Sequence, residues 1–179
     1  MSPTAVLPDG RFLAVWPSAL RLQVDDEWTD WGPMLPLAET VGELRRALVV
    51  VAADAAAIAT LTDNTCLAAA VGEMSWHRVS YGPNVGSQAW NFGISLAAPF
   101  RGQGMGAVAQ RLLAEYLFAA TAFDRVEAST DVTNVAEQRS LVKAGFHREG
   151  VLRGAQFRGS ARHDLVLYAV LRGEINSSG

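Results

Sequence analysis

The sequence has little cysteine, no strong excess of charge and no long apolar run. Its single cysteine, Cys66, excludes an internal disulfide framework and a zinc site of four thiolates, and it favours a cytoplasmic location. The formal net charge of −3 gives no general attraction to phosphate backbones, so we expect no nucleic-acid partner. The apolar run Ala47–Ala53 ends far short of the roughly 20 residues of a spanning helix, so we expect no membrane partner.

The remaining composition is that of a folded domain. Hydrophobic residues make up 50% of the 179 residues and charged residues 18%, close to the globular average. We find no repeat and no linker, and we expect residues 1–179 to form a single domain. No apolar segment of the signal-peptide type follows Met1, so we expect no secretory signal.

Hydrophobic periodicity predicts a mixed α/β fold. The most distinct element is an amphipathic helix from Gln103, in which Met105, Val108, Ala109 and Leu112 recur at helical spacing. The other expected elements are a helix over about Val41–Ala53 behind a Thr40–Glu43 capping box, a hairpin of Ala56–Leu61 and Leu67–Ser80, strands Gln88–Leu96 and Arg125–Thr130, a short helix opened by Asn134 and closed by Gly145, and strands Phe146–Gln156 and Asp164–Leu171.

A glycine-rich turn lies between the strand ending near Leu96 and the amphipathic helix. In Arg101–Gly106, three glycines at alternate positions let backbone N–H groups converge on an anion at the helix N-terminus, which favours a pyrophosphate. A turn that only packs helix against strand is the alternative. Gly102–Ala107 also fits the dinucleotide pattern, with Glu127 and Asp131 near the offset of a ribose-binding acid. The hairpin before it and the single βαβ unit after it argue against that pattern.

Three segments together resemble the GNAT acetyltransferase superfamily. Ile94–Gly106 is similar to its acyl-CoA signature, with Arg101, Gly104 and Gly106 in place. Asn134, followed by Lys143–Phe146, resembles the second signature of the branch that contains ribosomal-protein N-terminal acetyltransferases, and Asp164–Tyr168 resembles its closing strand. The motifs cover about residues 90–172, and the N-terminal half matches in element order alone.

The resemblance implies a mostly antiparallel mixed sheet, flanked by helices and splayed at an acyl-CoA site within about residues 88–172. Acetyl-CoA is the implied co-substrate. Backbone groups of Ile94 and Leu96 would pair with its pantetheine arm, and Asn134 would bond the same arm, cap a helix, or do both. The amides implied for the pyrophosphate belong to Arg101, Gly102, Gln103, Gly104, Met105 and Gly106.

The implied reaction is direct transfer of an acetyl group to a primary amine in a ternary complex. Two positions depart from the ribosomal branch, because Glu137 replaces a serine and Gln156 a glutamate. Our catalytic candidates are therefore Glu137, His77 and Tyr81. Each has a structural alternative: Glu137 as an acid in the first turn of a helix, and His77 and Tyr81 as residues at the rim of the sheet. The departures also leave open a non-catalytic acyl-CoA-binding sensor or scaffold.

The acceptor is predicted only as a class. Deprotonation at pH 7 costs about 1 kcal/mol for an α-amine and about 4.6 kcal/mol for a lysine-like amine, so without a clear strong base we favour an α-amine or another small-molecule amine of low pKa. Trp28 and Trp31 lie among acidic residues, and with Trp76 they are expected to line the acceptor site, unless they cover the core. The three histidines lack ligand spacing, so we expect no metal. The resemblance is compatible with a homodimer.

Overall fold

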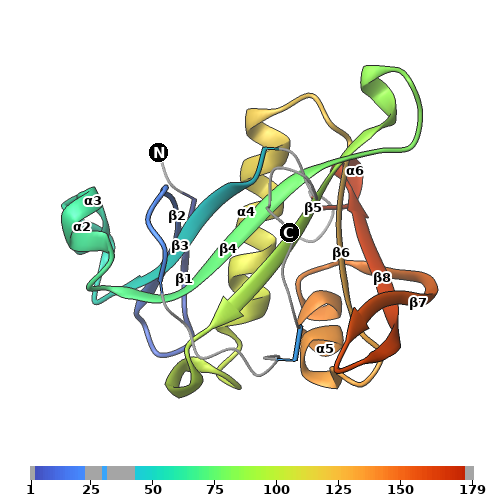
Figure 1. Cartoon of the computed structure of the whole chain (residues 1–179). Coiled ribbons are helices and arrows are strands. Elements are labelled where there is room, and N and C mark those ends of the chain that lie inside the picture. The colour runs from blue at the N-terminus through green and yellow to red at the C-terminus, as the bar shows by residue number, and fades with distance from the viewer. Residues whose placement is uncertain (1–2, 23–29, 32–42, 176–179) are drawn as a thin grey trace.

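The computed structural model describes residues 3–22, 30–31 and 43–175, whose strands form one eight-stranded sheet (Figure 1). The strand order is β1-β2-β3-β4-β5-β6-β8-β7, and every neighbouring pair is antiparallel except β5 with β6. This confirms the expected mixed, mostly antiparallel sheet. The strands are β1 (Thr4–Val6), β2 (Phe12–Pro17), β3 (Arg45–Ala52), β4 (Ala70–Ser80), β5 (Gln88–Leu96), β6 (Arg125–Asp131), β7 (His147–Arg158) and β8 (Ala161–Leu171).

Helices pack on both faces of this sheet. The longest, α4, crosses one face and buries Leu113 and Leu117 in the main core (Figure 1). On the other face Ile58 and Cys66 pack in a second, smaller cluster with Leu48. The helices are α2 (Ala55–Ala59), α3 (Asp63–Cys66), α4 (Met105–Ala120), α5 (Val135–Lys143) and α6 (Arg172–Ile175), with short 3₁₀ turns η1 (Val85–Ser87) and η2 (Ala98–Phe100). Within the described ranges, no helix is long and apolar enough to cross a bilayer.

The C-terminal elements match the sequence prediction, but two predictions before residue 62 are wrong. The expected helix over Val41–Ala53 is strand β3 where it is described, because its run of apolar residues, several of them β-branched, is buried on both faces of the sheet. The expected strand Ala56–Leu61 is helix α2 over most of its length. The Asp54 side chain accepts a hydrogen bond from the Ala57 N–H and caps this helix. Strands β1 and β2 were not predicted.

Strands β5 and β6 separate part-way along their length. Their parallel register contains Trp90 opposite Val126 and Asn91 opposite Glu127. Beyond Asn91, β5 continues beside β4 as far as Leu96, while β6 continues beside β8. We call this point of separation the fork. Since the two strands run in the same direction, the fork opens toward the turn that follows β5 and toward the N-terminus of α5.

Candidate functional site

The turn between β5 and α4 requires glycine at two positions. Gly102 has φ of 72° and Gly104 has φ of 81°, a left-handed backbone that other residues rarely adopt. A Cβ atom at either position would meet nothing within 4 Å, so the backbone conformation, not space, demands glycine. Gly104 is the N-cap of α4. The first amides of that helix have no intrahelical acceptor and point their partial positive charge out of the helix end.

Side chains tie this turn to the end of β5. The Arg101 Nε atom donates to the Leu96 carbonyl at 2.8 Å, and Gln103 Nε2 donates to the Pro99 carbonyl at 2.7 Å. A ligand that pairs with the Leu96 carbonyl would therefore compete with Arg101. The Met105 side chain is buried in the core, so Met105 can contact a phosphate only through its backbone amide. The predicted phosphate-binding residues thus form one continuous turn at the N-terminus of α4.

Helices α4 and α5 approach closely beside this turn. A Cβ on Gly106 would lie 3.0 Å from the Ser140 hydroxyl oxygen, so glycine permits the approach. The Ser140 hydroxyl donates to the side-chain oxygen of Gln110, Oε1, at 3.1 Å, and Gln110 Nε2 donates to the Glu137 carboxylate at 2.6 Å. Burial raises the pKa of Glu137 to about 7, although the bond from Gln110 opposes the rise. Asn134 caps α5, since its side-chain oxygen accepts from the Glu137 amide at 3.1 Å.

A second polar group lies on the face of the sheet opposite α4, at the fork itself. The Glu127 carboxylate is almost fully buried and accepts hydrogen bonds from Tyr81 Oη at 2.7 Å, Arg125 Nε at 2.9 Å and Asn91 Nδ2 at 3.2 Å. His77 is the β4 neighbour of Asn91, and it is half-buried. Burial lowers the pKa of His77, while the charge of Glu127 acts in the opposite direction. The predicted residues His77 and Tyr81 therefore meet around Glu127, whereas Glu137 lies between the helices.

The sequence did not identify Glu127, Asn91 and Arg125 as members of this group. Glu127 was considered only as a ribose-binding acid of the dinucleotide pattern. A signal was present, since Asn91 stands between Trp90 and Phe92 in a strand whose other side chains are largely apolar. A polar residue at such a position needs partners when buried, and here it donates to Glu127.

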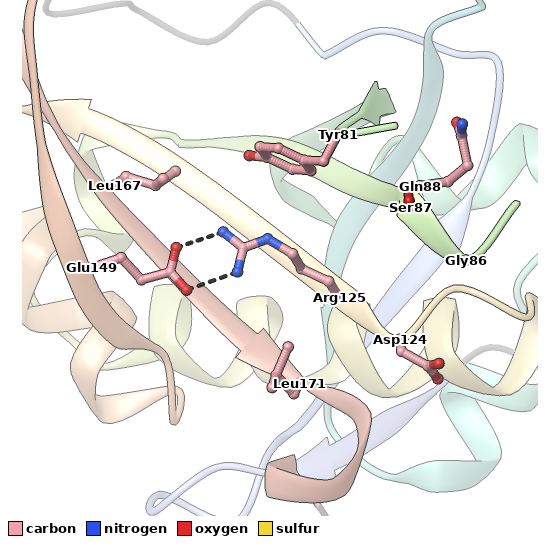
Figure 2. A pocket seen from close by; sticks show the side chains of 9 residues that line it. All are labelled: Tyr81, Gly86, Ser87, Gln88, Asp124, Arg125, Glu149, Leu167 and Leu171. Atoms are coloured by element: carbon pink, nitrogen blue, oxygen red, sulfur yellow. Dashed lines mark hydrogen bonds and ion pairs between the residues drawn. The ribbon is translucent and has the colours of Figure 1, made fainter. Parts of the chain in front are cut away.

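A cavity of about 520 Å³ opens beside this group (Figure 2). The connection between β4 and β5 contributes Tyr81 and residues 86–88, and β6 contributes Arg125. Strands β7 and β8 contribute Glu149 and two leucines. Arg125 donates from both terminal nitrogens to Glu149, at 2.7 and 2.6 Å. The cavity has the volume of a site for a small organic molecule.

Of the tryptophans proposed for the acceptor, Trp76 lies in the main core. It is 3% exposed, and its ring packs edge-on against Tyr116 of α4. Trp76 does not line the cavity, because alternate residues of a strand point to opposite faces of the sheet and His77 lies on the face opposite α4. Trp31 is 37% exposed. Trp28 lies outside the described residues.

A buried ion-pair network holds the segment that carries Trp31. Arg158 donates to Asp131 at 2.6 Å and to Asp30 at 3.2 Å, and the Arg158 and Asp131 side chains are each 5% exposed. Burial raises the pKa of Asp131, but hydrogen bonds from Thr133 and Arg158 more than offset it, so the net pKa is lowered. The Gly159 amide donates to the Asp30 carbonyl. These contacts fix Asp30 against the hairpin of β7 and β8. Among the described residues, no cluster of His, Cys, Asp and Glu would hold a metal.

A forked sheet beside a glycine turn at a helix N-terminus is the arrangement that the resemblance implied, and the comparison with known families agrees. Residues 16–147 match the family model described as the acetyltransferase (GNAT) domain. The chain belongs to the GNAT acetyltransferase family.

Solved structures share the fold at low sequence identity. The ribosomal-protein-S5-alanine acetyltransferase of Vibrio fischeri is 20% identical, with a TM-score of 0.55 over 72% of this chain and 61% of its own. RimJ of Mycobacterium smegmatis, in complex with CoA-disulfide, is 20% identical, with a TM-score of 0.58 over 74% and 55%. Spermidine N-acetyltransferase of Vibrio cholerae, with CoA and spermine, is 17% identical, with a TM-score of 0.57 over 75% and 69%. The match thus spans little more than half of the first two relatives.

Proposed function

We propose that this protein transfers an acetyl group from acetyl-CoA directly to a primary amine within a ternary complex. The observation that carries the proposal is the fork between β5 and β6, which opens toward the glycine turn at the N-terminus of α4. Family membership and the CoA bound in two of the similar structures support the choice of donor.

In this proposal the donor lies in the fork and along the adjacent turn. Backbone groups of Ile94 and Leu96 face the pantetheine arm, and the Asn134 amide group contacts it while also capping α5. The pyrophosphate binds the amides of residues 101–106, where the end of the α4 dipole favours an anion by about 0.3–1 kcal/mol.

The reaction needs a neutral amine and a place for one proton. The amine nitrogen attacks the thioester carbonyl carbon, a C–N bond forms, and the C–S bond breaks. His77 is the proposed acceptor of the proton that the nitrogen loses, because its lowered pKa keeps the imidazole neutral near pH 7. The proton then passes from His77 to the CoA thiolate, which leaves an amide, a neutral imidazole and free CoA thiol. Burial and the bond to Glu127 raise the pKa of Tyr81, so its hydroxyl stays protonated and able to donate.

The acceptor remains a class of amines in this proposal. The similar structures include enzymes named for a ribosomal protein and for spermidine, so both protein N-termini and small amines are represented among them. A cytoplasmic location fits the single cysteine, Cys66, which is buried, and fits the use of acetyl-CoA. A homodimer stays a prediction.

The alternative is an acyl-CoA-binding sensor without turnover, which the departures at Glu137 and Gln156 favour. Calorimetry with acetyl-CoA, CoA and NAD tests the donor site, and binding of NAD without CoA would refute it. Thiol release from acetyl-CoA with a mixture of amines tests the reaction. Sustained multiple turnover supports the enzyme, whereas acetyl-CoA binding without turnover on any amine supports the sensor.

A further inference from the structure

The cavity beside Glu127 extends along the fork on the face opposite α4. In the register of β6 with β8, Leu171 lies opposite Arg125, Ala169 opposite Glu127, and Leu167 opposite Ser129. The two leucines line the cavity (Figure 2). By strand register the small Ala169 lies between them on the same face of the sheet. The lining of the cavity therefore extends from the paired part of β6 to Leu167, which lies opposite Ser129 just past the fork.

The charges at and beside the cavity favour a cation. Arg125 lines the cavity and donates from both terminal nitrogens to Glu149, which also lines it, and from Nε to Glu127, which is buried beside it. One guanidinium between two carboxylates leaves a single negative charge. Asp124 at the rim is paired with Arg172 at 2.8 Å. An anionic ligand would thus meet a net negative charge and an arginine already paired with two carboxylates, while one ammonium group would balance the charge.

The walls of the cavity favour an apolar body for that cation. Tyr81 is 63% exposed, its hydroxyl is held by Glu127, and the Arg125 guanidinium lies over its ring at 5.5 Å from the centroid, so the ring is fixed and its remaining surface is open to a ligand. Leu171, at the end of β8 and opposite Arg125 of β6, is 47% exposed. Exposed apolar groups that converge on one cavity gain free energy when a ligand covers them. A polyamine carries more positive charge than the single negative charge can balance.

We propose that this cavity is the acceptor site and that it takes a small monoamine with an apolar carbon body, its ammonium group directed toward the pair of carboxylates that flank Arg125. This inference rests on the proposed acetyl transfer and specifies its substrate class. A protein N-terminus and a polyamine are the competing occupants that the experiment separates.

The experiment measures thiol release from acetyl-CoA with phenethylamine, spermidine and an alanine-initiated peptide. Phenethylamine is expected to have a kcat/KM at least tenfold above the other two. Leu171→Lys, which adds a positive charge and removes an apolar wall, is expected to raise the KM for phenethylamine at least tenfold. Calorimetry should show unchanged CoA binding. Leu152→Lys is the matched control, because Leu152 is similarly exposed at 42% and is not among the residues that line the cavity.

The outcomes separate the two proposals. Preference for the peptide or for spermidine, or a KM for phenethylamine that changes equally in Leu171→Lys and Leu152→Lys, would overturn the acceptor inference while acetyl transfer stands. Acetyl-CoA binding without turnover on any amine would overturn both. Loss of CoA binding in Leu171→Lys would place the cavity on the donor side and also overturn the acceptor inference.

Discussion

Replacement of Glu137 by glutamine should change how the stability of the protein depends on pH. Burial between α4 and α5 raises the pKa of this carboxyl from 4.5 to about 7. A rise of that size corresponds to about 3 kcal/mol of unfolding free energy. Between pH 4.5 and 7 the folded state binds a proton that the unfolded state has released. The folded wild-type protein therefore loses stability as the pH rises through this window, and glutamine removes the loss.

The expected signal is a difference in Tm that grows with pH. Glutamine keeps the oxygen that accepts from Gln110, but its new amide N–H groups lack an assigned partner and cost about 1–3 kcal/mol at every pH if left unpaired. That cost lowers the Tm of Glu137→Gln by a similar amount at every pH, so it does not change how the Tm difference depends on pH. From pH 4.5 to pH 8, the Tm of Glu137→Gln minus that of the wild type should rise by about 6–12 °C.

Thermal melts followed by circular dichroism at half-unit pH steps provide the assay. Glu115→Gln is the control, because Glu115 is a partly exposed glutamate of α4 paired with Arg111. A Tm difference that stays constant across the window would refute the argument from burial. Activity separates the roles: kcat at pH 7.5 within about twofold of wild type makes Glu137 structural. A fall of about 100-fold or more supports its place among the catalytic candidates.

Three further substitutions test other parts of the site. Gly104→Asp should abolish CoA binding in calorimetry, because it strains a backbone at φ of 81° and sets a carboxylate beside the phosphates; Gly104→Ala, with the strain alone, should retain more of the affinity. Arg158→Ala should lower the unfolding free energy in urea by about 3–5 kcal/mol, since Asp131 is left buried without its cation; the exposed Arg162→Ala should cost under about 1 kcal/mol. Trp31 does not line the cavity, so Trp31→Ala tests whether its segment is a second contact for the acceptor: a raised acceptor KM with unchanged CoA Kd and Tm supports that contact, whereas a Tm lower by many degrees with intact kinetics makes this segment structural.

The sequence predicted the C-terminal half of the fold because its elements carry local signals. Helix α4 shows a helical period from Met105 onward, and the φ > 0 positions between β5 and α4 are glycines that the sequence displays directly. Strand β3 carries no such signal. Ala47–Val50 is apolar at every position because both faces of the sheet are covered, and an unbroken apolar run does not distinguish a strand from a buried helix.

The sequence predicted the phosphate-binding turn more completely than the group around Glu127, and the reason is chemical. A pyrophosphate is bound by consecutive backbone amides, so its site must be one contiguous segment and can be recognised as a motif. The group around Glu127 depends on strand register instead. Tyr81 is 46 residues away from Glu127 and Asn91 is 36, and no spacing rule links them until the sheet order is known.

The same difference explains why the donor follows from the family and the acceptor does not. Every member that uses acetyl-CoA must hold the same phosphates and the same arm, so the residues of that segment are constrained by one ligand. The cavity beside Glu127 is assembled from β6, β7, β8 and the connection between β4 and β5, and a substitution at Leu171 or Tyr81 changes its shape or charge without touching the donor turn. If the cavity is the acceptor site as proposed, acceptor specificity depends on the balance of Arg125 against its two carboxylates, and substitutions at these residues measure it.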